Sequence, residues 1–133
     1  MTDIGANIRY SDSDRFLRAA LSGLAARQRV ISNNVANADT PNFKASVVNF
    51  EDALRNAIAG RAGLGADSQA ALNASVSQPS VVTNTQVRGD GNNVDIDREM
   101  VQLAETTLTF GALTQIMATR LAMMRSVITD GRR

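Results

Sequence analysis

Carboxylates are the side chains of this sequence best suited to acid–base chemistry, because it contains neither histidine nor cysteine. The chain therefore has no imidazole base, no thiol nucleophile and none of the nitrogen or sulfur ligands of the usual zinc sites. Two close pairs, Glu51 with Asp52 and Asp95 with Asp97, have the residue types of a general acid–base pair. Their surroundings in the sequence do not indicate a pocket, so we expect no catalytic residue and no enzyme activity.

An acidic segment, Asp90–Glu99 (DGNNVDIDRE), has the composition of a calcium-binding loop. In the EF-hand loop a glycine stands midway and a bidentate glutamate at the end. Here the glycine is at the second position, Val94 takes a ligand position, and Val101 stands in place of the glutamate. We therefore interpret these carboxylates as helix caps and expect no metal site.

Anionic ligands are not indicated either. Gly60, Gly63 and Gly65 spell G-x-x-G-x-G, but they lack a preceding strand and a P-loop lysine, so phosphate binding is not expected. Fourteen basic residues against 13 acidic ones give a net charge of +1, which does not indicate a nucleic-acid-binding face. We thus expect no cofactor, no nucleic acid and no small-molecule substrate. A basic C-terminus is interpreted as a solvated helix end, with Arg120, Arg125, Arg132 and Arg133.

The composition favours helices that complete their burial against other chains. A length of 133 residues is enough for one small domain. Although 44% of the residues are hydrophobic, only 4% are aromatic, so a dense self-sufficient core is not expected. The sequence has no apolar run long enough to span a bilayer. Its N-terminus lacks the apolar region of a cleavable signal peptide, so export is expected to use another route.

The first periodic segment runs from about residue 14 to residue 38. Its apolar residues alternate spacings of four and three, which is the heptad pattern of a coiled-coil helix. Ser13 or Asp14 is suited to cap its start. The expected seam consists of Leu17, Leu21, Leu24, Gln28, Ile31, Val35 and Ala38.

A second periodic segment runs from about residue 97 to residue 128. Asp95 or Asp97 is a suitable cap, and with Asp97 a hydrophobic staple would join Ile96 to Val101. No charged residue occurs from Thr106 to Thr119, whereas the surface helix of a monomer normally carries charges on its outer face. The expected seam consists of Ile96, Met100, Leu103, Thr107, Phe110, Thr114, Met117, Leu121, Met124 and Ile128.

These patterns predict an all-α fold in which the two long helices form an antiparallel coiled-coil hairpin. Residues 47–59 fit a short third helix or a turn followed by a helix, Ser80–Val87 a short strand, and Asp90-Gly91 a turn. The two helical segments are expected to form one helical domain. The predicted divisions are a flexible N-terminus (1–13), the helix, turn and short helix (14–59), a loose, weakly β middle segment (60–93), the C-terminal helix (94–129) and a tail (130–133).

Two interpretations of the seams stay open. In one, the wide apolar surface of the second helix and the small residues of the first serve packing in a larger assembly. In the other, the chain is an ordinary antiparallel coiled coil that dimerises through one face. Both assign a structural role. The residues expected to pack are Leu17, Leu21, Leu24, Ile31, Val35, Met100, Leu103, Phe110, Met117, Leu121 and Met124.

A distinctive string, Ser32–Ala45 (SNNVANADTPNFKA), follows the first long helix. Its asparagine amides can satisfy the backbone groups at a helix end or reach a neighbouring chain. Thr40 precedes a proline and is excluded from the helical region, whereas Asn42 suits a left-handed conformation. Phe43 can fold back as an apolar plug. The residues assigned to the turn are Asn33, Asn34, Asn37, Thr40, Pro41 and Phe43.

The whole string has the form N-N-x-A-N-x-x-T-P-x-F on an N-terminal heptad helix, and it resembles the signature of bacterial flagellar rod and hook proteins. The resemblance covers residues 14–59 and 93–128, and it implies long terminal helices that pack together in an axial tube. Distal rod and hook proteins carry large inserted domains, so a chain of 133 residues resembles a short, proximal rod protein. Asn42 departs from the family, which commonly has glycine there.

Two short rod proteins are distinguished by their C-terminal helices. FlgC typically carries N-V-x-x-x-E-M followed by an R-A-Y-Q-A-N element. Here Glu105–Leu113 reads ETTLTFGAL, so that element is missing. The C-terminal helix is similar to that of the other short rod protein.

The resemblance implies a structural subunit of the proximal rod, the driveshaft that carries motor torque. Its expected location is the flagellar basal body, in the rod within the periplasm, reached without a cleaved signal peptide. The expected partners are copies of itself, the rod proteins FlgC and FlgF, the adaptor FliE, the MS ring and the flagellar type III export apparatus. The alternatives are a soluble helical adaptor or chaperone of a secretion system, and another short rod protein resembling FlgC.

Overall fold

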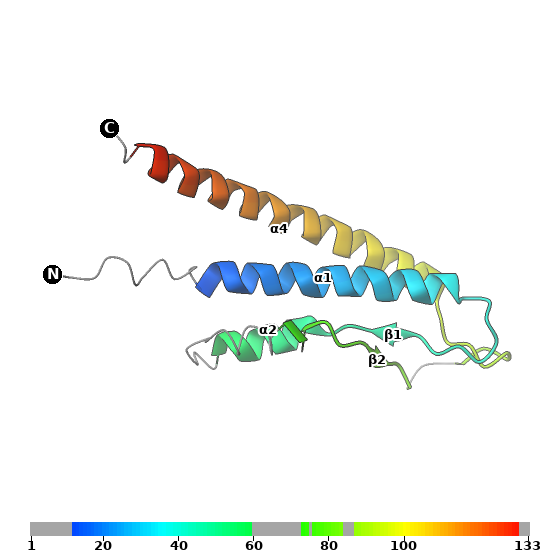
Figure 1. Cartoon of the computed structure of the whole chain (residues 1–133). Helices are drawn as coiled ribbons and strands as arrows, with labels where there is room; N and C mark the ends of the chain where they lie inside the picture. Colours follow the sequence, from blue (N-terminus) through cyan, green and yellow to red (C-terminus); the bar gives the residue numbers. More distant parts are fainter. Residues whose placement is uncertain (1–11, 60–72, 75, 84–86, 131–133) are drawn as a thin grey trace.

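The computed structural model describes residues 12–59, 73–74, 76–83 and 87–130, and these are mostly helical. Two long helices, α1 (Asp12–Ala36) and α4 (Ile96–Asp130), run antiparallel and pack against each other (Figure 1). The other described elements are the helix α2 (Phe50–Ala59) and the strands β1 (Ser46–Val47) and β2 (Ser80–Val81). The prediction of a mostly helical fold with two long helices is confirmed.

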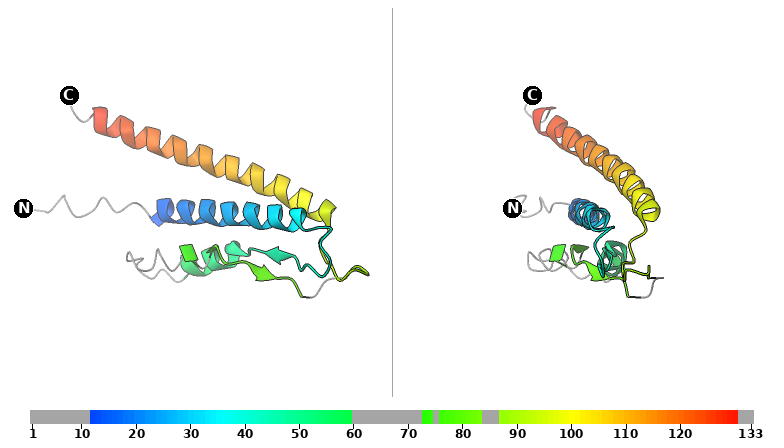
Figure 2. Two further views of the ribbon diagram at one scale, coloured as in Figure 1. Left: turned by 45° about the vertical axis from the view of Figure 1, so that its right-hand side comes forward. Right: turned by 90° about the vertical axis from the view of Figure 1, so that its right-hand side faces the viewer.

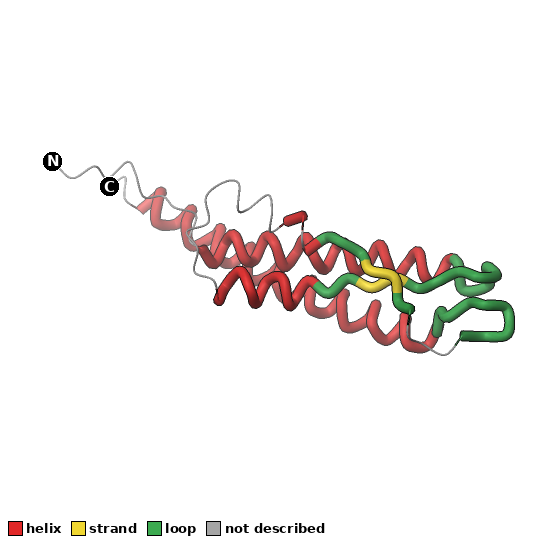
Figure 3. Tube along the Cα trace, turned by 90° about the horizontal axis from the view of Figure 1, so that it is seen from below, coloured by secondary structure: helices red, strands yellow, loops and turns green. Residues whose placement is uncertain are grey.

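The helix α1 is the middle of three layers. The helix α4 lies along one side of it, and α2 with the antiparallel β1–β2 pair lies along the other (Figures 1 and 2). The loops gather at the end where α1 stops and α4 starts (Figure 3). Helices can pack on both sides of α1 at close range because much of it is small and buried, at Ala19, Ala20, Gly23 and Ala26.

Gly23 sets the distance between α1 and α2. A Cβ atom at this position would lie 2.5 Å from Cγ of Phe50, so a side chain would collide with the aromatic ring. Phe50 is the first residue of α2 and shares the main core with Leu24 and Val76, which are 1% and 0% exposed. The start of α2 is thus held against α1 by a ring that covers a glycine.

Three side-chain contacts define the register of α1 against α4. From the turn outward they are Asn34–Glu99, Gln28–Thr107 and Asp14–Arg120, at 3.1, 3.4 and 3.2 Å. Each step toward the start of α1 is matched by a step toward the end of α4, as antiparallel packing requires. The two axes draw apart toward the C-terminal end of α4 (Figure 1), so the finer prediction of a coiled-coil hairpin is not confirmed.

The face of α4 that contacts α1 is rotated from the predicted seam. The two coincide at Leu103, Phe110 and Met117, which are partly buried. At the predicted seam positions that alternate with these three, the residue one place earlier in the sequence is the less exposed one. Because α4 is apolar nearly all round, its hydrophobic period did not select which side would face α1. The residues that take these alternate positions are Glu99, Thr106, Leu113 and Arg120.

Element boundaries differ from the prediction by a few residues. The helix α1 stops at Ala36 because Ala38 donates its N–H to Val35 in a tight turn (3.2 Å). The short helix starts at Phe50 because Ser46 and Val47 pair with β2 instead. Residues 1–11 and 131–133, which make up most of the predicted flexible ends, and residues 60–72, the first part of the predicted middle segment, lie outside the described residues.

Of the strand expected over Ser80–Val87, the described residues form a strand at Ser80 and Val81, and residues 84–86 lie outside the described part of the chain. Val82 still donates its N–H to the Ala45 carbonyl (2.8 Å), but an amide side chain then takes over the pairing. Asn93 accepts the Ala45 N–H (2.6 Å) and donates to the Val82 carbonyl (2.9 Å). A side chain from the segment before α4 therefore extends the pairing of the two strands.

Asp95 caps the start of α4. Its carboxylate accepts the N–H of Arg98 at 3.2 Å, so of the two predicted caps it is Asp95 that makes the capping bond. The staple predicted with Asp97 does not apply, and its two members, Ile96 and Val101, are 44% and 59% exposed.

Candidate assembly interface

The turn after α1 has the bend that its sequence predicts. Asn42 is the one described non-glycine residue with a positive φ, at 61°, so asparagine supplies the left-handed conformation that a glycine would otherwise provide. Its N–H donates to the Asp90 carbonyl at 2.9 Å, which joins the turn to the loop before α4. Pro41 is exposed, whereas Phe43 packs on the small cluster of Ala38, Ala45 and Val94.

A surface chain of side-chain hydrogen bonds closes the end of α1. The Asn37 amide donates to the carbonyl and side-chain oxygens of Asn33, at 2.8 and 3.1 Å. Thr40 in turn donates its hydroxyl to Asn37 Oδ1 at 3.3 Å. These polar side chains occupy the last-turn groups that an α-helix leaves without partners.

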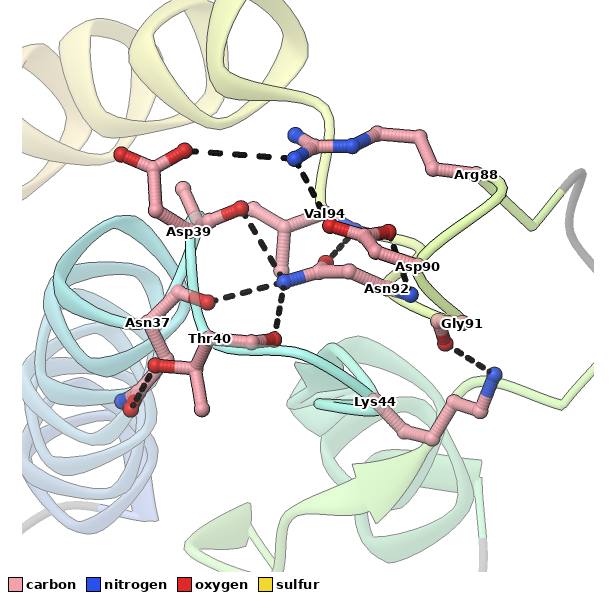
Figure 4. A network of polar contacts seen from close by, with 10 residues as sticks. Asn37, Asp39, Thr40, Lys44, Arg88, Asp90, Gly91, Asn92 and Val94 are labelled. Carbon is pink, nitrogen blue, oxygen red and sulfur yellow. Dashed lines mark hydrogen bonds and ion pairs between the residues drawn. The ribbon is translucent and has the colours of Figure 1, made fainter.

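Asn92 lies at the centre of a second network that holds the same turn, although no sequence pattern indicated this residue. It is fully buried, with 0% exposure. Its Oδ1 accepts the Val94 N–H at 2.7 Å. Its Nδ2 donates to three carbonyls of the turn (Figure 4), which belong to Asn37 (2.9 Å), Ala38 (3.0 Å) and Thr40 (2.9 Å).

The acidic loop before α4 serves this network. Asp90 accepts the Asn92 N–H at 3.0 Å, and this bond, together with the Arg88 guanidinium 3.0 Å away, lowers the pKa of the Asp90 carboxyl. Gly91 has a φ of 81°, and Lys44 donates to its carbonyl at 2.6 Å (Figure 4). Within the described residues there is no cluster of three or more acidic side chains suited to a metal ion.

Asn34 and Glu99 form the buried junction of α1, β1 and α4. Asn34 is 0% exposed and acts as a strand partner, because its amide accepts the Ser46 N–H at 3.0 Å and donates to the Ser46 carbonyl at 2.8 Å. The same amide donates to Glu99 Oε1, while Glu99 Oε2 is buried without a hydrogen-bond partner. Burial raises the pKa of the Glu99 carboxyl, against the lowering effect of the Asn34 bond.

The residues predicted to pack fall into two groups in the single chain. In α1, Leu24 and Ile31 are buried and Leu17, Leu21 and Val35 are partly buried. In α4, three of them contact the α1 side, as described above. The remaining three, also in α4, are 51%, 50% and 42% exposed, and they are Met100, Leu121 and Met124.

Exposed apolar side chains are concentrated on α4. In the part of the chain that the structure describes, thirteen large hydrophobic residues are exposed, and ten of them belong to this helix, including Leu108 at 76% and Val127 at 73%. A concentration of exposed apolar side chains on one element is typical of a protein–protein interface. None of the described helices combines the length and hydropathy needed to cross a bilayer.

Known proteins are similar to this chain over most of its length. A family model described as flagella basal body rod protein matches residues 15–44. FlgB of Bacillus subtilis (strain 168) is 33% identical over 126 residues, which cover 92% of this chain and 98% of that protein. FlgB of Borrelia hermsii is 37% identical over 120 residues, covering 81% and 89% of the two chains. FlgB of Salmonella typhimurium is 31% identical over 128 residues, covering 88% and 93%. The chain belongs to the FlgB family.

The FlgB family is one of structural rod proteins of the flagellar basal body, which confirms the resemblance found from the sequence. The segment matched by the family model, 15–44, runs from the first turns of α1 through the whole bend. The loop that holds the bend from outside, Arg88–Val94, lies beyond that segment. Asn92 was missed because a polar residue in a Gly-Asn-Asn loop gives no sign of a contact more than fifty residues away.

Proposed function

We propose that this FlgB-family chain is a subunit of the proximal rod, held in the rod through the exposed apolar surface of α4. The observation that carries the proposal is the exposure of ten large hydrophobic residues on one helix of a chain that belongs to this family. A structural subunit needs no catalytic site, and the polar clusters of the turn are engaged in holding the backbone.

Torque transmission is the mechanical task that this surface suits. A driveshaft must resist shear through many contacts that act in parallel, and apolar side chains spread along a helix supply such contacts. These side chains are 42–76% exposed in the single chain, so covering each one with a neighbour stabilises the rod by about 1–2 kcal/mol. Many moderate contacts thus replace one strong bond.

The wider setting follows the family. The proposed partners are further copies of this chain, the rod proteins FlgC and FlgF, the adaptor FliE and the MS ring. The proposed location is the rod within the periplasm, reached through the flagellar type III export apparatus without a cleaved signal peptide. An uncovered apolar α4 is consistent with a subunit that is completed only where it assembles.

Leu121→Asp tests the rod function. Leu121 is 50% exposed, so the charge should change the stability of the single chain by less than about 0.5 kcal/mol. In a strain that lacks this gene, we expect wild type to restore swimming and Leu121→Asp to abolish it at equal expression. Ile58→Asp is the matched control, because Ile58 is 52% exposed but lies on α2. Normal swimming with Leu121→Asp would contradict the role of α4.

Leu24→Asp also follows from the predicted seam, but it is the weaker test. Leu24 is 1% exposed, so a buried charge there would unfold the chain and stop motility for that reason alone. The alternative of a soluble adaptor or chaperone predicts a defined dimer in a concentrated sample. Tubes or polydisperse oligomers would support the rod subunit.

A further inference from the structure

A groove of about 540 Å³ lies where α1, α2, β1 and α4 meet. Its apolar lining includes Leu24 and Val30 of α1, Leu54 of α2 and Leu113 of α4. A groove of this size and character accepts the apolar face of a helix, in which anchors at i, i+3 or i+4 and i+7 enter together.

The two acidic side chains that line the groove differ in their partners. Glu51 pairs with Arg27 at 2.6 Å, and Arg27 is held further by the Val48 carbonyl and by the Phe50 ring 4.7 Å away. Glu105 has no ion-pair or hydrogen-bond partner for its carboxylate among the described residues. The groove therefore offers one unengaged negative charge beside an apolar floor.

The C-terminal end of α4 has the complementary character. The contact of Asp14 with Arg120 places the start of α1 at Asp12 opposite residue 122, so α4 continues past it. All side chains from residue 121 to residue 129 are exposed. Leu121, Met124 and Ile128 share one face of the helix. Arg125 lies on that same face, and its guanidinium has no partner among the described residues.

We propose that residues 121–129 of α4 in one copy lie in the α1–α2–α4 groove of a second copy, with Arg125 paired to Glu105. This contact rests on the proposed rod function and names the surface through which the copies join. A chain cannot make the pair with itself, because twenty residues of one helix separate the two by about 30 Å. The contact joins different surfaces of the two copies, so it repeats head to tail and leaves each copy with both surfaces available to further copies.

Charge reversal is the first test. Glu105→Arg and Arg125→Glu each place like charges together, and we expect each to lower self-association of the purified chain by about tenfold or more. The double variant restores the pair with the charges exchanged, so its association should return to within about threefold of wild type. Circular dichroism should show equal helicity in all four proteins, because both side chains are exposed. A double variant as defective as the singles would overturn the pairing.

Disulfide trapping is the second test, and the chain suits it because it contains no cysteine. Thr109 lines the groove, and Ile128 is 71% exposed on the opposing surface. A disulfide requires Cα atoms within about 7 Å, whereas these two positions lie about 28 Å apart in one helix. A bond between them therefore reports two molecules.

We expect an oxidised mixture of Thr109→Cys and Ile128→Cys to give the mixed dimer at least tenfold above a mixture of Thr109→Cys and Ala36→Cys. Ala36 is the control because it is exposed at the last position of α1 and does not line the groove. Homodimers of Thr109→Cys in excess of the mixed dimer would indicate a symmetric contact and overturn the proposal.

The failure of this contact can be told apart from the failure of the rod function. If wild type does not restore swimming to a strain that lacks this gene, the rod function fails. If wild type restores swimming, both single charge variants swim equally well and no mixed disulfide forms, the groove contact alone fails.

Discussion

At the end of the molecule where α1 turns toward β1, hydrogen bonds from side chains and from the backbone hold the chain in its bend. The Asn92 side chain alone serves three carbonyls and one N–H there. At the opposite end, where α4 runs past the start of α1, every side chain from residue 121 to residue 129 is exposed. One end is completed by specific hydrogen bonds, and the other presents an apolar surface that no described residue covers.

This difference separates the two tasks of a rod subunit. Specific, buried hydrogen bonds give the turn one conformation, since an unpaired buried group costs more than a bond contributes. Because the turn is bonded to the loop that precedes α4, it also places the start of α4 beside the end of α1. The exposed side chains of α4 are non-directional by comparison, so they suit repeated contacts whose geometry is set elsewhere.

Asn92→Ala should break the completed end and has the largest expected effect. It leaves the Asn37, Ala38 and Thr40 carbonyls without this donor, and it removes an acceptor from the Val94 N–H. We expect a loss of about 3 kcal/mol in the free energy of unfolding, measured by urea denaturation.

The matched control for this prediction lies at the open end. Met124→Ser removes an apolar side chain that is 42% exposed, and we expect it to change the free energy of unfolding of the single chain by less than about 0.5 kcal/mol. Equal losses for the two variants would mean that the two ends do not differ as described.

Much of the completed end was predictable from local sequence. Thr40 and Pro41 predict the end of a helix, Asn42 predicts a left-handed residue, and Asp90-Gly91 predicts a turn. These predictions are possible because each rule depends only on neighbours in the chain. The Asn92 bonds were not predictable, since they join segments more than fifty residues apart.

The α1–α4 contact was predictable only in part, for a related reason. The hydrophobic period identified both helices, but α4 is apolar on several sides and its period cannot say which side faces α1. The side of α4 that faces α1 is the one that carries partners for polar side chains of α1. Glu99 and Arg120, which no hydrophobic pattern would choose, reach Asn34 and Asp14.

Glu99→Gln tests the comparison at the buried junction of α1, β1 and α4. Glu99 is the one charged side chain of α4 that is buried, among the described residues. Its raised pKa, caused mainly by burial, means that the folded chain binds this proton more readily than the unfolded chain. The stability associated with protonation is therefore present below the ordinary pKa of glutamate and is lost as the pH rises through the folded value. We expect Glu99→Gln to be more stable than wild type at neutral pH, by an amount on the order of 1 kcal/mol.

The check is urea denaturation of both proteins between pH 4 and pH 8. The difference between them should shrink as the pH falls, because protonated Glu99 is then as neutral as glutamine. Asp97→Asn is a suitable control, since Asp97 is an exposed carboxylate on the same helix turn. A difference that is independent of pH would contradict the assignment to Glu99.

Asp90 should show the opposite dependence on pH, with the smallest effect of these substitutions because its carboxylate is exposed to solvent screening. The Asn92 N–H and Arg88 lower its pKa, so the stability it contributes is present above the ordinary pKa of aspartate and is lost as the pH falls through the lowered value.

Asp90→Asn keeps an oxygen for the Asn92 N–H but removes the charge that faces Arg88. It should therefore melt slightly below wild type at neutral pH and level with it once wild-type Asp90 is protonated, whereas Asp90→Ala, which has no acceptor, should melt below both at every pH. Identical melting of the alanine and asparagine variants would show that the carboxylate holds the turn through its charge alone, and that the short Asp90–Asn92 bond contributes nothing to the completed end.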